Sequence, residues 1–150
     1  MTHPVVAAAR ELIGKPFRHR GRGPTYYDCA GVCLYAVQRA YGGPLFDVRH
    51  YGRNPFADGL RATLVANLGE PVLAAPLTED PMPGDIALIR YEPTAEPRHV
   101  AVIGAHPLGG LSLIHTYSGA ALPGVPAGRV AEHILDAHWR ACIVEVFRCS

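Results

Sequence analysis

The first half of the chain carries apolar residues at helical spacing. The stripe nearest the N-terminus consists of Val5, Val6, Ala9, Leu12 and Ile13. Thr2 suits the N-cap of this helix, Pro4 suits an early helical position, and Gly14 is expected to end it. A loop rich in glycine and proline follows, and it ends at an aspartate.

Two more helices are predicted after that loop. Asp28 is a good N-cap residue for a helix over 29–41, which the following glycine pair would end. A third helix is predicted over 58–68, with four apolar residues facing inward. These four are Leu60, Leu64, Val65 and Leu68.

After Pro71 the apolar residues come in short runs separated by turn residues, which is typical of strands. Strands are predicted over 86–90, 99–105, 111–117 and 141–148, and the sequence HPLGG joins the middle two as a hairpin. Helices followed by adjacent strands predict an α+β fold in which the N-terminal helices pack on an antiparallel sheet. With 150 residues, 49% of them hydrophobic, we expect one domain over 1–150.

Charge and hydropathy exclude several classes of partner. The net charge of +1 provides no broad basic field, so nucleic acid is not an expected partner. No apolar run approaches the ~20 residues that cross a bilayer, and membrane insertion is not expected. The N-terminal segment lacks the cationic start and long apolar stretch of a secretion signal, so we expect synthesis to end in the cytoplasm.

The four cysteines are expected to be free thiols, because a core of this size does not need disulfides. They are Cys29, Cys33, Cys142 and Cys149. Their spacing does not suit a structural zinc site, and we predict no metal or cofactor. Cys33 lies one turn after Cys29 on the apolar side of the predicted helix and is expected in the core.

Cys29 is the candidate nucleophile. It follows a capping aspartate and opens a helix, so its sulfur would lie near unsatisfied backbone N–H groups and the positive end of the helix dipole. Both effects are expected to favour the thiolate, and the same N–H groups could stabilise an oxyanion. The alternative is a small buried cysteine, which is what most free cysteines are.

A cysteine nucleophile needs a base, usually a histidine, and a third group that orients the base. Of the eight histidines, His99 and His115 lie on predicted strands beside turns, and the hairpin would bring them together. Each alone is more commonly a structural histidine, but their combination with Cys29 favours catalysis. The other six are terminal, in loops or turns, surface-like, or without an evident partner: His3, His19, His50, His106, His133 and His138.

Basic residues precede the nucleophile in the segment HRGR, which could bind a substrate carboxylate or form a solvated charged loop. The two arginines concerned are Arg20 and Arg22. The candidate supporting residues nearest the nucleophile are Phe17, Tyr27 and Asp28. Asp28 is expected to fix the loop as a helix cap more than to move protons.

Several motifs, in order along nearly the whole chain, resemble the NlpC family of papain-like cell-wall cysteine peptidases. They are AARELIGKPFRHRGRG, DCAGVCLYAV, PGDIALIR, RHVAVI and LIHTY. The resemblance implies a papain-like core with Cys29 as nucleophile, His99 as base and His115 as the residue that orients it. It also implies hydrolysis of the bond between D-glutamate and a diamino acid in peptidoglycan stem peptides.

The segments GKPFRHRGR, YGRNP and DAHWRACIVEVFR most resemble the branch of this family found in phage tails and gene transfer agents. This implies a virion component that contacts tail-tip or baseplate proteins. Two features depart from the family pattern: Phe17 stands where a tyrosine is common, and YGRNP replaces the motif L-P-R-x-S. Tyr26 or Tyr27 could supply the missing hydroxyl. Two alternatives remain open, namely a structural tail-hub component with little activity and a thiol amidase or acyltransferase.

Overall fold

The computed structural model describes residues 1–47, 59–117 and 128–149. The N-terminal part is helical, and strands dominate the rest of the chain. The helices are α1 (Pro4–Arg10), α2 (Cys29–Tyr41), α3 (Leu60–Leu68) and α4 (Ala137–Cys142). The strands are β1 (Leu73–Ala74), β2 (Ile86–Ile89), β3 (His99–Ala105), β4 (Leu111–Thr116), β5 (Val130–Ile134) and β6 (Ile143–Phe147).

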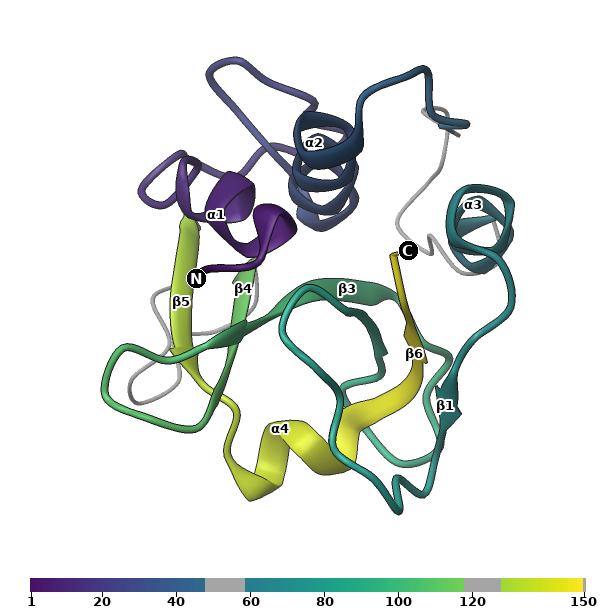
Figure 1. Ribbon diagram of the computed structural model, residues 1–150. Coiled ribbons are helices and arrows are strands. Elements are labelled where there is room, and N and C mark those ends of the chain that lie inside the picture. The colour runs from purple at the N-terminus through teal and green to yellow at the C-terminus, as the bar shows by residue number, and fades with distance from the viewer. Residues whose placement is uncertain (48–58, 118–127, 150) are drawn as a thin grey trace.

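The strands form one six-stranded sheet in the order β1-β6-β2-β3-β4-β5, and all neighbours pair antiparallel. Helices α1 and α2 lie on one side of the sheet, and α4 lies on the other (Figure 1). The predicted α+β class, with N-terminal helices packed on an antiparallel sheet, is confirmed.

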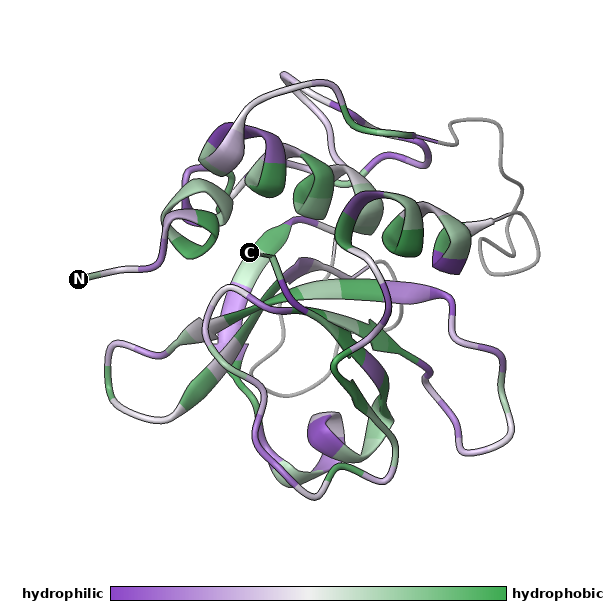
Figure 2. Ribbon diagram, turned by 45° about the vertical axis from the view of Figure 1, so that its right-hand side comes forward, coloured by the Kyte–Doolittle hydropathy of each residue, from purple (hydrophilic) through white to green (hydrophobic). Residues whose placement is uncertain are grey.

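Both faces of the sheet are buried because side chains alternate along each strand. On β3, Val100 and Val102 pack in the core shared with α1, α2 and α3. Ala101 and Ile103 join a second cluster with Trp139 on α4. The helices turn their hydrophobic sides toward the sheet (Figure 2). Side chains at consecutive positions of one strand therefore reach opposite layers.

Helix α1 differs from the sequence-based prediction at both ends. His3 rather than Thr2 is the N-cap, since its Nδ1 atom accepts a hydrogen bond from the Val5 N–H at 3.1 Å. Regular helix ends at Arg10, so the expected inward residue Ile13 is 47% exposed. A histidine cap is uncommon, and the sequence pattern favoured the hydroxyl of Thr2.

The predicted bounds of the second helix and of the strand over 99–105 are confirmed. Helix α3 begins at Leu60, and position 58 lies outside the described residues. Of its expected inward residues, Leu60 and Leu64 are buried, whereas Val65 and Leu68 are half-buried.

The predicted strand over 141–148 is wrong at its start, where Ala141 and Cys142 belong to α4. The Asp136 side chain caps this helix by accepting a hydrogen bond from the Trp139 N–H at 2.8 Å. Strands β1 and β5 were not predicted. The first is very short, and the second becomes a strand by pairing with β4.

Candidate active site

Asp28 fixes the start of α2, as the sequence predicted. Its Oδ1 atom accepts hydrogen bonds from the Gly31 N–H and from Arg22 Nη1, both at 2.7 Å. The preceding loop lies so close that a Cβ at Gly31 would overlap the Gly21 carbonyl oxygen. The small residue in the motif DCAG is therefore required for the loop to pack against the helix.

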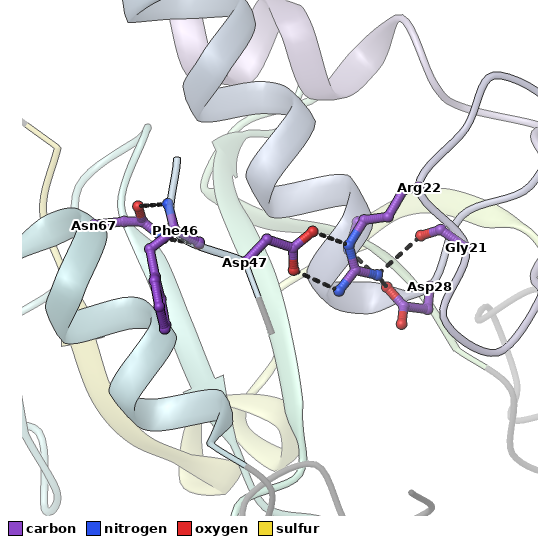
Figure 3. A network of polar contacts seen from close by, with 7 residues as sticks. Gly21, Arg22, Asp28, Phe46, Asp47 and Asn67 are labelled. Carbon is purple, nitrogen blue, oxygen red and sulfur yellow. Dashed lines mark hydrogen bonds and ion pairs between the residues drawn. The ribbon is translucent and has the colours of Figure 1, made fainter. Parts of the chain in front are cut away.

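Arg22 ties this helix end to a distant segment (Figure 3). Its Nε and Nη2 atoms donate to the two carboxylate oxygens of Asp47 at 2.9 and 3.0 Å, and Nη1 also donates to the Gly21 carbonyl at 3.1 Å. The neighbouring Phe46 exchanges two backbone hydrogen bonds with the Asn67 side chain of α3. The loop before the nucleophile is thus linked to α3.

This network gives Arg22 a structural role, distinct from both alternatives weighed from the sequence. Its side chain is 10% exposed and engages two carboxylates, so it is not part of a solvated loop. Arg20 is exposed and has a positive φ of 63°. Of the two arginines, Arg20 is the exposed one, and its contact with a substrate carboxylate stays a prediction.

Cys29 is half-buried at the N-terminus of α2. The backbone N–H groups of Ala30 and Val100 donate toward its sulfur. Val100 is the second residue of β3, so the sulfur lies beside the strand end that carries His99. No hydrogen bond joins Cys29 to His99, both of which are described; such contacts commonly tighten only when substrate binds.

His99 and His115 are brought together as predicted from the hairpin. His99 Nε2 lies 2.5 Å from His115 Nδ1, and the rings are 3% and 1% exposed. A third histidine continues this row of hydrogen-bonded rings, because His115 Nε2 lies 2.7 Å from His133 Nε2. The expectation that His133 is surface-like is wrong: it lies on β5 and is only 9% exposed.

Aromatic side chains enclose the histidines on the α4 side of the sheet. Trp139 packs against His115 and His133, with ring centroids 5.3 Å apart in both cases. Tyr91 packs against His99 with centroids 5.5 Å apart, and burial together with nearby Cys29 raises the pKa of its hydroxyl. Sequence reasoning missed both aromatics, although each lies within a motif quoted above or directly after one.

Tyr27 packs among the helices, whereas Tyr91 is the tyrosine that packs against His99. The Tyr27 ring is buried in the helical core edge-on to Tyr35, with centroids 6.0 Å apart. Phe17 is half-buried, and its backbone forms an isolated bridge with Tyr27. Tyr26 is exposed and packs under the guanidinium of Arg18. The tyrosine in contact with His99 is therefore the one that follows β2.

Burial disfavours the charged forms of both the nucleophile and the neighbouring base. Desolvation raises the pKa of the Cys29 thiol to about 12, and the charge of Asp28 acts in the same direction. Desolvation also lowers the pKa of His99 to about 3. This direction is opposite to the one expected from the helix end, because the cost of burying the charge acts against the N–H donors.

Over the described ranges, no group of three or more histidine, cysteine, aspartate or glutamate side chains is arranged to bind a metal ion. In the same part of the chain, no helix has the length and apolar character needed to cross a bilayer. The segment YGRNP and His50 lie outside the described residues.

Solved structures with the same architecture identify the fold. The NlpC/p60 domain of the peptidoglycan hydrolase SagA superposes with a TM-score of 0.54 at 22% identity, covering 96% of this chain and 95% of that one. The chain has an NlpC/p60-like fold. NlpC1 from Trichomonas vaginalis shares this fold with a TM-score of 0.53 at 18% identity, and the match covers 97% of this chain but 42% of that protein. No family model and no curated protein matches the sequence.

Proposed function

We propose that this chain is a cysteine peptidase that hydrolyses peptidoglycan stem peptides. One observation carries the proposal: Cys29 opens α2 beside the strand end that holds His99, and His99 is hydrogen-bonded to His115. This combines a nucleophile, a base and an orienting group in the order required for acyl transfer. The similarity of the fold to the domain of a peptidoglycan hydrolase supports the substrate class.

In the first half-reaction, His99 accepts the thiol proton as Cys29 attacks the amide carbonyl. The resulting oxyanion lies near the helix end, where backbone N–H groups such as that of Ala30 can stabilise it. The carbon–nitrogen bond then breaks, and His99 returns its proton to the departing amine. A thioester joins the acyl fragment to Cys29.

In the second half-reaction, water replaces the amine. His99 removes a proton from the water, whose oxygen attacks the thioester carbonyl. The carbon–sulfur bond breaks, the thiol regains the proton, and the acid product leaves. Because the three histidines form a fixed chain, His99 presents the same ring nitrogen in both halves.

The bond we propose is the one between D-glutamate and the diamino acid of the stem peptide, as the family resemblance implies. Arg20, exposed on the loop before Cys29, is the proposed partner for a substrate carboxylate. We also propose that the chain acts as part of a phage-type tail tip. The segments GKPFRHRGR and DAHWRACIVEVFR support this by their resemblance to that branch of the family.

Digestion of defined muropeptides in water enriched in ¹⁸O tests the function and the reaction class together. Mass spectrometry is expected to show two fragments, with one ¹⁸O in the newly formed carboxylate of the D-glutamyl product. Cleavage at the amide between the glycan and the peptide would show that the chain is an amidase and not an endopeptidase. Transfer to an added amine without ¹⁸O uptake would indicate an acyltransferase.

Intact muropeptides after incubation with folded protein would contradict the proposal. Cys149→Ala is a matched control, since Cys149 is also half-buried but lies after β6 at the other end of the chain. It is expected to cleave as the wild type does.

A further inference from the structure

We propose that His133 is a positioning residue that fixes the tautomer of His99 by acting through His115. Its effect on turnover rests on the function proposed above, whereas the tautomer itself does not. The structural basis is a continuous hydrogen-bonded chain that crosses three neighbouring strands. His99 lies on β3, His115 on β4 and His133 on β5.

The contact of His133 with the backbone determines which ring nitrogens donate along the row of three histidines. His133 Nδ1 lies 3.0 Å from the backbone carbonyl oxygen of Ile134. A carbonyl oxygen can only accept a hydrogen bond, so Nδ1 of His133 carries the proton. In a neutral imidazole the other nitrogen then has a free lone pair, and His133 Nε2 is an acceptor.

The same reasoning passes from ring to ring. His115 Nε2, at 2.7 Å from that acceptor, must be the donor, which leaves His115 Nδ1 without a proton. His99 Nε2, at 2.5 Å from His115 Nδ1, must therefore also donate. Nδ1 of His99 remains as an unprotonated lone pair, which is the form that can accept the thiol proton of Cys29.

Burial stabilises this set of tautomers, because water cannot replace a lost hydrogen-bond partner. His115 is 1% exposed and His133 is 9% exposed, so water is largely excluded from both rings. Trp139 packs against the two rings and offers no acceptor, since its indole nitrogen is a donor. A reversed tautomer at any ring would face two donors or two lone pairs across a short buried contact, which is unfavourable.

Removal of the hydrogen-bond acceptor at position 133 is expected to free His115, and through it His99, to adopt either tautomer. In His133→Phe, the ring volume is nearly kept but His115 Nε2–H loses its partner. His115 can then adopt either tautomer, and His99 follows it. The fraction of His99 with a proton on Nδ1, the nitrogen that must act as base, is expected to rise. In His133→Gln, the side-chain carbonyl can still accept from His115.

Nitrogen-15 NMR of the histidine rings measures this directly in the uncomplexed protein at neutral pH. We expect the wild type and His133→Gln to show His99 with its proton on Nε2, and His133→Phe to show a mixture. Two results would overturn the proposal: a wild-type His99 protonated mainly on Nδ1, or a folded His133→Phe variant with an unchanged tautomer. If His133→Phe does not fold, the wild-type spectrum and that of His133→Gln decide.

Kinetics with a muropeptide substrate then test the consequence. His133→Phe is expected to lose roughly tenfold or more in kcat with little change in KM, because orientation of the base acts in the chemical step. His133→Gln is expected to recover most of the loss. A merely structural role predicts that kcat follows thermal stability in both variants.

The two proposals fail separately. If the wild type cleaves no muropeptide but its histidines show the expected tautomers, the proposed function is wrong and the positioning role of His133 stands. If the wild type cleaves and His133→Phe has the same kcat and the same tautomer, the function stands and the role of His133 is wrong.

Discussion

Nε2 of His99 lies 2.5 Å from Nδ1 of His115, so one ring nitrogen of the proposed base is hydrogen-bonded to a side chain of β4. We predict that His115→Ala lowers kcat on the order of 10²-fold or more while KM changes little, because the lost contact orients the base in the transition state. Steady-state kinetics on a defined muropeptide measure both constants.

His115→Asn is the matched control for that variant. The amide oxygen of asparagine can stand near the position of Nδ1 and accept from His99, so much of the activity is expected to return. Equal activity of wild type and His115→Ala would remove His115 from the catalytic group.

The Cys29 side chain is predicted to be a thiol at neutral pH, since desolvation raises its pKa to about 12. The ultraviolet absorbance of a thiolate, taken as the difference between wild type and Cys29→Ala, measures this directly. We expect no thiolate band at neutral pH and its appearance only in strongly alkaline solution. A band that persists to mildly acidic pH would show a thiolate–imidazolium pair instead.

Stability toward acid is predicted to depend on the buried histidines. Desolvation lowers the pKa of His99 from 6.5 to about 3. Below pH 6.5 the unfolded chain therefore binds a proton that the folded chain does not, and lower pH favours unfolding until the folded His99 itself titrates. The free energy of unfolding should fall by up to about 1.4 kcal/mol per pH unit for this residue.

Denaturant unfolding at a series of pH values tests this dependence. Between pH 6.5 and 3, His99→Gln should reduce the slope of unfolding free energy against pH by the amount that corresponds to about one proton. His138→Gln, at an exposed position on α4, should leave the slope as it is. The same slope in His99→Gln and wild type would contradict a neutral buried His99.

The two aspartate caps are predicted to differ in their contribution to stability. Asp136→Ala removes an exposed cap and is expected to cost about 1 kcal/mol of unfolding free energy. Asp28→Ala also removes one of the two carboxylates that bind Arg22, while Asp47 still pairs with it, and we expect a larger loss of roughly 2–4 kcal/mol. Urea unfolding of the two variants compares them. Equal losses would mean that the arginine pair contributes little.

Local signals in the sequence predicted the elements that carry the nucleophile and the base. Asp28 before the helix and the glycine pair after it define α2, and the HPLGG turn places His99 and His115 on paired strands. These features act over a few residues, so the sequence alone is enough to recognise them.

The parts that were missed depend on contacts between distant segments. His133 is buried because β5 pairs with β4 and because Trp139 packs on it from α4, a helix whose last two residues were predicted as the start of a strand. Arg22 is held by Asp47, 25 positions later in the chain. Neither the pattern of hydrophobic residues nor local propensity encodes such pairings.

The most direct test of the central claim is thiol-dependent cleavage of a purified muropeptide, followed by mass spectrometry for wild type, Cys29→Ala and Cys149→Ala. We predict two new fragments with wild type and with Cys149→Ala, and none with folded Cys29→Ala. Cleavage by Cys29→Ala at the wild-type rate, or no cleavage by any of the three proteins, would contradict the account.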